Sequence, residues 1–203
     1  MVKINQDRII GVFAPSGYGK SVLVASLIDK IAEKGRVIWY DTDLEQYKYS
    51  FNNNVKFFKP DIQRKDELRY LNEFIAGLRA ETTDIYLVVD DLDKFFDANT
   101  SLSKASVELK NLSSASRHQR IAFIYCSKQP RYIPAKLISN TNLFYIGQFS
   151  EYGDLQKFKP MLNKRDILYE GKNTDSFAVI KVLKKDRHEF IEYDRWTNTI
   201  KVI

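Results

Sequence analysis

The stretch VFAPSGYGKSVLVASLI, from Val12 to Ile28, runs from an apolar segment across two glycines into an amphipathic pattern. The apolar segment predicts a buried strand, and the spacing of apolar residues after the glycines predicts a helix that stops at Gly35. A phosphate group binds where several backbone N–H groups converge, as they do in a loop that wraps before a helix N-terminus. The sequence APSGYGKS, from Ala14 to Ser21, therefore predicts a phosphate-binding loop, although alanine stands where such a loop usually opens with glycine.

The residues of this loop have distinct predicted roles. Gly17 and Gly19 can adopt backbone angles that other residues avoid, which lets the amides turn inward. Lys20 is expected to reach the β- and γ-phosphates of ATP, and the hydroxyl of Ser21 to ligate Mg²⁺. Ala14 is small, which is what the start of the loop requires sterically. The predicted nucleotide-binding residues are Ser16, Gly17, Tyr18, Gly19, Lys20, Ser21 and Val22.

Apolar segments alternate with amphipathic ones along the rest of the chain. Strands that are apolar along their whole length, separated by helices, indicate a parallel sheet covered by helices on its faces. The predicted strands are 8–14, 36–41, 55–58, 84–91, 120–127 and 142–149, and the predicted helices are 21–35, 64–81 and about 101–118.

The C-terminal part of the chain has a different pattern. Three short strands are expected at 176–183, 188–194 and 199–203, joined by turns such as KKDR and RWTN, and they indicate an antiparallel appendage. The predicted fold class is α/β, with a mainly parallel sheet flanked by helices and this antiparallel β appendage. Residues 1–203 are expected to form one domain, with a core over about 8–150 and a C-terminal helix and β-hairpin region over about 151–203.

Two aspartates, Asp90 and Asp91, follow the apolar segment YLVV. An acid at the end of a buried strand is how nucleotide-binding folds of this type bring a carboxylate to magnesium. We expect Asp90 to hold Mg²⁺, directly or through water, and Asp91 to orient or deprotonate the attacking water. The sequence leaves open which of the two aspartates activates the water.

The strand from Ile121 to Cys126 is expected to lie between the two strands that carry the loop and the acids. Its C-terminal end then faces the γ-phosphate, where Ser127 and Gln129 can hydrogen-bond to a phosphate or a water. Arg117 and Arg120 precede this strand. Neither can easily reach the nucleotide of its own subunit, but either one is placed to act as an arginine finger on a neighbouring subunit.

These motifs resemble those of the FtsK–HerA group of P-loop motor ATPases. More narrowly, they resemble the genome-packaging NTPases of archaeal icosahedral viruses such as the Sulfolobus turreted icosahedral viruses. The resemblance covers roughly residues 8 to 150 and rests on APSGYGKS, on YLVVDD, and on an arginine followed by a strand and SKQP. It implies a RecA/ASCE-like P-loop NTPase fold. This chain also departs from the group, because it has Asp90 and Asp91 where the group usually has Asp-Glu. The roles that the resemblance implies are phosphate and metal binding for Lys20 and Ser21, magnesium for Asp90, water activation for Asp91, sensing for Gln129 and the finger for Arg117.

The function implied by the resemblance is an ATP-hydrolysing motor that forms a homo-oligomeric ring and translocates double-stranded DNA in viral genome packaging. A capsid or portal vertex would be a further partner. The net charge of +6 is compatible with a polyanionic partner, and the basic clusters 162–166 and 184–187 are candidate contacts to DNA phosphates. Two alternatives stay open: a small-molecule kinase of the P-loop class, and a nucleotide-dependent switch or scaffold without motor activity.

The composition sets outer limits on these hypotheses. A hydrophobic share of 44% and a charged share of 29% are those of a soluble globular domain. No apolar run approaches the roughly 20 residues of a membrane helix, so no membrane span is expected. Charges within the first residues argue against a secretion signal, and the single cysteine suits a reducing compartment. The expected location is the cytoplasm, which is the host cytoplasm if the protein is viral.

Overall fold

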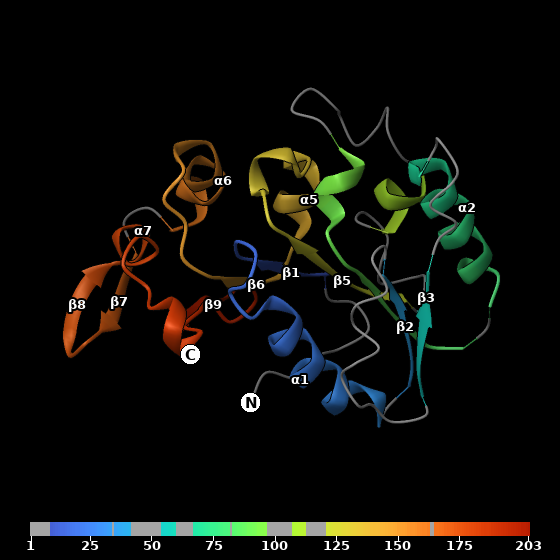
Figure 1. Cartoon of the computed structure of the whole chain (residues 1–203), viewed down its shortest axis with the longest axis horizontal. Helices are drawn as coiled ribbons and strands as arrows, with labels where there is room; N and C mark the ends of the chain where they lie inside the picture. Colours follow the sequence, from blue (N-terminus) through green and yellow to red (C-terminus); the bar gives the residue numbers. More distant parts are fainter. Residues whose placement is uncertain are drawn as a thin grey trace.

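The computed structural model describes residues 9–33, 35–41, 54–59, 67–81, 83–96, 107–112, 121–162 and 165–203. Its centre is an eight-stranded sheet with the strand order β10-β9-β6-β1-β5-β4-β2-β3, and helices lie on both faces (Figure 1). The three central strands are parallel and every one of their residues is buried, because helices cover both sides of the sheet. The predicted α/β fold class is confirmed. These central strands are β1 (Ile9–Phe13), β5 (Ile121–Ser127) and β4 (Ile85–Val89).

The outer strands differ in direction on the two sides of this centre. β2, β3 and β6 continue the parallel pairing, whereas β9 pairs antiparallel with β6 and β10 antiparallel with β9. β5 lies between β1 and β4, as predicted from the sequence. The outer strands are β2 (Arg36–Tyr40), β3 (Val55–Phe58), β6 (Leu143–Ile146), β9 (Ile191–Asp194) and β10 (Thr199–Val202).

Alternate residues of the central strands enter two separate cores. On one face they pack against α1 (Lys20–Ala32). On the other face they pack against α2, α5 and α6, which lie together above the sheet in Figure 1. The ring of Phe13 is central there, with centroids of Tyr125, Phe144 and Phe158 at 5.5, 6.2 and 5.2 Å. The helices of this face are α2 (Glu67–Arg79), α5 (Ala135–Asn140) and α6 (Tyr152–Leu162).

The C-terminal prediction is correct in part. β9 and β10 form and the RWTN turn joins them, but they extend the main sheet through β6 instead of standing apart from it. The separate antiparallel pair is a hairpin that the sequence analysis missed, β7 (Asp166–Tyr169) with β8 (Lys172–Asp175). Its two turn residues, Glu170 and Gly171, have φ of 48° and 77°, as a two-residue type I′ turn requires.

The predicted strand at 176–183 is wrong, because its first half forms the helix α7 (Ser176–Val179). The carboxylate of Asp175 accepts a hydrogen bond from the backbone N–H of Ala178 at 3.0 Å, and this cap favours a helix over an extended chain. The predicted helix at about 101–118 is described only over 107–112, where it is helical. In the described part of the chain, no helix has the length and apolar character needed to cross a bilayer.

Candidate nucleotide-binding site

The loop between β1 and α1 leads into a helix whose N-terminus lacks a side-chain cap from the described residues. Gly17 and Gly19 have φ of +69° and +98°, conformations that favour glycine. Gly19 is the N-cap of α1, and no side chain of the described residues caps the helix or places an acid in its first turn. The first N–H groups of a helix lack partners within the helix and attract anions. The loop therefore has the backbone geometry of a phosphate site.

Lys20 is folded back onto the start of this loop. Its Nζ donates hydrogen bonds to the carbonyl oxygens of Ala14 at 2.7 Å and Pro15 at 3.1 Å. Burial lowers the pKa of Lys20, and the thiol of Cys126 and the carboxylates of Asp91 and Asp90 oppose that effect. A phosphate bound at the loop would compete with these carbonyls for the N–H donors of the ammonium group.

The side chain of Tyr18 lies beneath the loop. Its hydroxyl donates a 2.8 Å hydrogen bond to the carbonyl of Glu189, and its ring meets Phe190 edge-on at 5.3 Å. Burial raises the pKa of Tyr18 to about 12. A Cβ on Gly147 would come within 2.7 Å of the Tyr18 ring and 2.8 Å of the Ala14 Cβ. The side chain of Tyr18 is therefore not available to a nucleotide, and the approach of Gly147 to Ala14 shows why position 14 must be small.

A segment from the far end of the sequence supports the loop from outside. Nδ1 of His188 lies 2.9 Å from the carbonyl oxygen of Tyr18, and a Cβ on Gly19 would come within 2.8 Å of that same nitrogen. Nζ of Lys185 lies 3.8 Å from where a Cβ of Gly17 would be. The sequence analysis missed these contacts as part of the site, and a separation of 170 residues leaves no local pattern from which to find them.

Asp90 follows the last residue of the central strand β4 and lies next to another buried acid. Its backbone N–H donates to the carbonyl of Tyr40 at 3.1 Å, and Asp41 follows directly at the end of β2. Burial, together with the charges of Asp91 and Asp41, raises the pKa of Asp90 to about 6. Asp41 was not singled out from the sequence, although an acid after a predicted strand was the available signal.

Asp91 is held by two lysines. Its backbone is left-handed, with φ of 46°, and its Oδ2 lies 2.5 Å from Nζ of Lys128 and 3.3 Å from Nζ of Lys94. The backbone N–H of Lys128 in turn donates to Oδ1 of Asp93 at 2.9 Å. The carboxylate predicted to activate water is thus paired with a lysine that the sequence analysis did not identify.

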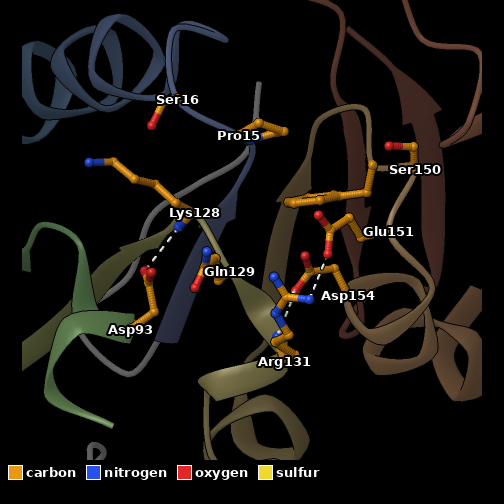
Figure 2. A pocket seen from close by; sticks show the side chains of 10 residues that line it. Pro15, Ser16, Asp93, Lys128, Gln129, Arg131, Ser150, Glu151 and Asp154 are labelled. Atoms are coloured by element: carbon orange, nitrogen blue, oxygen red, sulfur yellow. Dashed lines mark hydrogen bonds and ion pairs between the residues drawn. The ribbon is translucent and has the colours of Figure 1, made fainter. Parts of the chain in front are cut away.

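Gln129 lines a pocket of about 440 Å³ at the carboxyl end of the sheet (Figure 2). Pro15 and Ser16 of the phosphate loop also line it. On its far side, the guanidinium of Arg131 donates to the Glu151 carboxylate at 2.6 Å. Oδ1 of Asp154 accepts a 2.9 Å hydrogen bond from the backbone N–H of Arg131. Gln129 is therefore close to the loop. In contrast, Ser127 is fully buried and does not line the pocket; among the described residues its hydroxyl has no hydrogen-bond partner.

The structure brings most of the predicted site residues to one edge of the sheet. Ser16 and Val22 are exposed on the loop and helix, with Val22 54% accessible. Arg117 and Arg120 lie outside the described residues, so their predicted role as a finger stays a prediction. In the basic cluster 184–187, Lys184 is already paired with Glu170.

No protein-family model matches the chain, and no curated protein matches it. Solved structures do match, and they are P-loop ATPases, so the fold is that of this class. The genome-packaging NTPase B204 from Sulfolobus turreted icosahedral virus 2, in complex with AMPPCP, has a TM-score of 0.75 and 17% identity, covering 98% of this chain and 97% of that one.

Two further structures extend the comparison. The DNA-packaging ATPase B204 from Sulfolobus turreted icosahedral virus has a TM-score of 0.73 at 17% identity, over 98% of both chains. The pCW3 conjugation coupling protein TcpA, with ATPγS, has a TM-score of 0.67 at 14% identity, over all of this chain and 61% of that one. The resemblance expected from the motifs is confirmed for the fold.

The close packing at Gly147 gives a stability prediction. Gly147→Ala places a methyl group within 2.8 Å of both Tyr18 and Ala14, so one of them must move. We expect the free energy of unfolding to fall by about 1–3 kcal/mol, the usual cost of overpacking. Urea denaturation followed by circular dichroism measures it.

The matched control is Gly77→Ala in α2, where an added Cβ meets nothing within 4 Å. Alanine is the better helix former, so this variant should gain about 0.5–1 kcal/mol. Equal changes in the two variants would contradict the packing described at the loop.

The raised pKa of Asp90 predicts a pH-dependent effect of Asp90→Asn. A folded-state pKa of about 6, against 3.8 ordinarily, means that the folded chain holds this proton more tightly than the unfolded chain. The protonated Asp90 therefore contributes to the free energy of unfolding fully below about pH 4, and this contribution is lost as the pH rises through 6. Asp90→Asn removes that loss, so it should stabilise the protein at pH 7.5 by up to about 3 kcal/mol. Thermal melts should show that the stabilisation by Asp90→Asn decreases toward pH 4. A stabilisation that does not depend on pH would contradict the raised pKa of Asp90.

Proposed function

We propose that the protein is an ATP-hydrolysing motor that translocates double-stranded DNA, in viral genome packaging. One observation supports the proposal most directly. The phosphate loop, with the N-terminus of α1 that no described side chain caps, lies with Lys20 and the acids Asp90 and Asp91 at one edge of the sheet. The fold is shared over nearly the whole length of a genome-packaging NTPase, which supports the proposal.

The chain's own residues would divide the work of hydrolysis as follows. The amides of residues 16–22 and the N-terminus of α1 bind the phosphates, and Lys20 exchanges its two carbonyl acceptors for phosphate oxygens. Asp91 accepts a hydrogen bond from the attacking water and orients it. Gln129, on the pocket beside the loop, hydrogen-bonds at the terminal phosphate.

Magnesium fits this set of residues. Asp90 is a buried carboxylate whose charge is disfavoured by burial and by two further acids, so a cation there would be stabilised. Mg²⁺ takes few protein ligands beside phosphate oxygens and water, and no cluster of three or more metal-binding side chains occurs among the described residues. Ser21 and Asp90 would hold the ion, which supplies charge neutralisation at the phosphates.

The motor proposal includes partners. A homo-oligomeric ring would let Arg117, or Arg120, reach a neighbouring subunit's nucleotide as an arginine finger. DNA phosphates would be bound by basic residues such as those at 162–166 and 184–187, independently of sequence. A capsid or portal vertex would anchor the ring, and the motor would work in the host cytoplasm.

The pocket beside the phosphate loop favours a second candidate, a small-molecule kinase. It lies next to Ser16, has room for a small acceptor, and carries Gln129 and Arg131 as hydrogen-bond donors. Phosphoryl transfer to such an acceptor, in excess of hydrolysis, would favour the kinase. A third candidate, a nucleotide-dependent switch or scaffold, would bind ATP without turnover.

The first test is phosphate release from Mg-ATP with and without linear double-stranded DNA. Wild-type hydrolysis should rise with DNA, and this stimulation should weaken steeply with added salt because phosphate contacts release counterions. Lys20→Ala should lower kcat by about 100-fold or more, since it removes the charged donor on the transferring phosphate.

Lys30→Ala is the matched control, because Lys30 is an exposed lysine on the same helix. It should hydrolyse ATP like the wild type. Hydrolysis that ignores DNA would overturn the motor proposal while leaving an ATPase, and ATP binding without any turnover would favour the switch.

A further inference from the structure

Lys128 makes the shortest ion pair to the proposed water-activating carboxylate. Its Nζ lies 2.5 Å from Oδ2 of Asp91, whose side chain is only 6% exposed. Nζ of Lys94 approaches the same oxygen at 3.3 Å from the 3₁₀ turn η2 (Leu92–Phe95). Two ammonium groups on one carboxylate oxygen occupy its lone pairs, so that oxygen cannot also accept a hydrogen bond from water.

The position of Lys128 also gives it access to the phosphate loop. It follows the last residue of β5, and its backbone is fixed by the hydrogen bond to Asp93 that Figure 2 shows. Its side chain is 36% exposed and lines the same pocket as Ser16 of the loop. The positive charge of Lys128 also contributes to lowering the pKa of Lys20, so the two ammonium groups act on one another. One lysine thus lies between the acid and the proposed phosphate site.

A triphosphate would compete with Asp91 for this lysine. The terminal phosphate of a nucleoside triphosphate carries more charge and more acceptor oxygens than one carboxylate. Asp91 would not be left as an isolated buried charge, because Lys94 still contacts it. The ammonium group can therefore change partners without the large cost of a buried unpaired ion.

We propose that Lys128 is a phosphate-sensing residue, which exchanges Asp91 for the terminal phosphate of a bound nucleoside triphosphate and so frees Asp91 to accept a hydrogen bond from water. A diphosphate lacks the group that competes for Lys128, so with ADP the lysine stays on Asp91. Asp91 is therefore able to accept a hydrogen bond from water only when a third phosphate is bound. The sensing role rests on the proposed function in that Asp91 acts on water and ATP is the ligand.

The test is the ratio of the dissociation constants for ADP and ATPγS, each measured with Mg²⁺ by calorimetry on the full chain. Lys128→Met should lower this ratio about tenfold, the effect expected from losing one charge-assisted hydrogen bond to a phosphate. Lys128→Arg keeps a cationic donor and should retain most of the discrimination. Lys30→Met is the matched control, since it removes an exposed lysine from the last turn of α1, and it should leave the ratio unchanged.

The readouts separate this proposal from the proposed function. A thermal melt of each variant shows that it is folded, since Lys128 is partly exposed. A ratio that Lys128→Met leaves unchanged, or that Lys30→Met lowers equally, would overturn the sensing role and reduce Lys128 to a partner of Asp91. Phosphate release by the wild type tests hydrolysis separately. A lowered ratio without wild-type hydrolysis would support sensing and overturn the ATPase.

Discussion

Parallel pairing of β5 with both β1 and β4 determines where the groups of the site can lie. Phe13 is opposite Ser127 and Val89 is opposite Tyr125, so the three strands end within two residues of one another. The chain then leaves each strand at the same edge, where the carboxyl ends of parallel strands form a crevice. The phosphate loop, the acids that follow Val89 and the lysine that follows Ser127 meet there without being near one another in sequence. No single motif contains the site, because the register of the sheet assembles it.

The C-terminal strands complete this edge. β9 pairs antiparallel with β6, and Ile191 lies opposite Ile146, which itself lies opposite Phe13. The chain must therefore enter β9 from beyond the carboxyl ends of β1 and β6, which is where the phosphate loop lies. Glu189 and Phe190 then meet the buried Tyr18. Since their contacts fix the underside of the loop, the last part of the chain is a structural part of the candidate nucleotide site and not an appendage to it.

Local sequence signals predicted the elements better than the contacts between them. The glycines and Lys20 of the loop, the apolar strands and the acids after β4 were all readable, because each depends on neighbours in sequence. The strand expected at 176–183 is wrong because one hydrogen bond, from the Ala178 N–H to the Asp175 carboxylate, caps a helix there, and apolar alternation does not predict it. Asp41 and Lys128 join the site only through strand register, and His188 only through the antiparallel return of β9. These are long-range pairings, which composition and periodicity do not encode.

The charged groups of the site are bound to acceptors and donors of the chain itself. Lys20 donates to two loop carbonyls, Lys128 pairs with Asp91, and burial raises the pKa of Asp90 to about 6. Each of these partners is of the kind that a nucleotide or metal would supply: an oxygen acceptor for the lysines and a positive charge for the acid. Ligand binding at this edge is then an exchange of partners, and its free energy is the difference between two sets of buried interactions. A nucleotide with more phosphates would replace more of these internal partners and so gain more binding free energy. We therefore expect the site to distinguish nucleotides by their number of phosphates more than by their base.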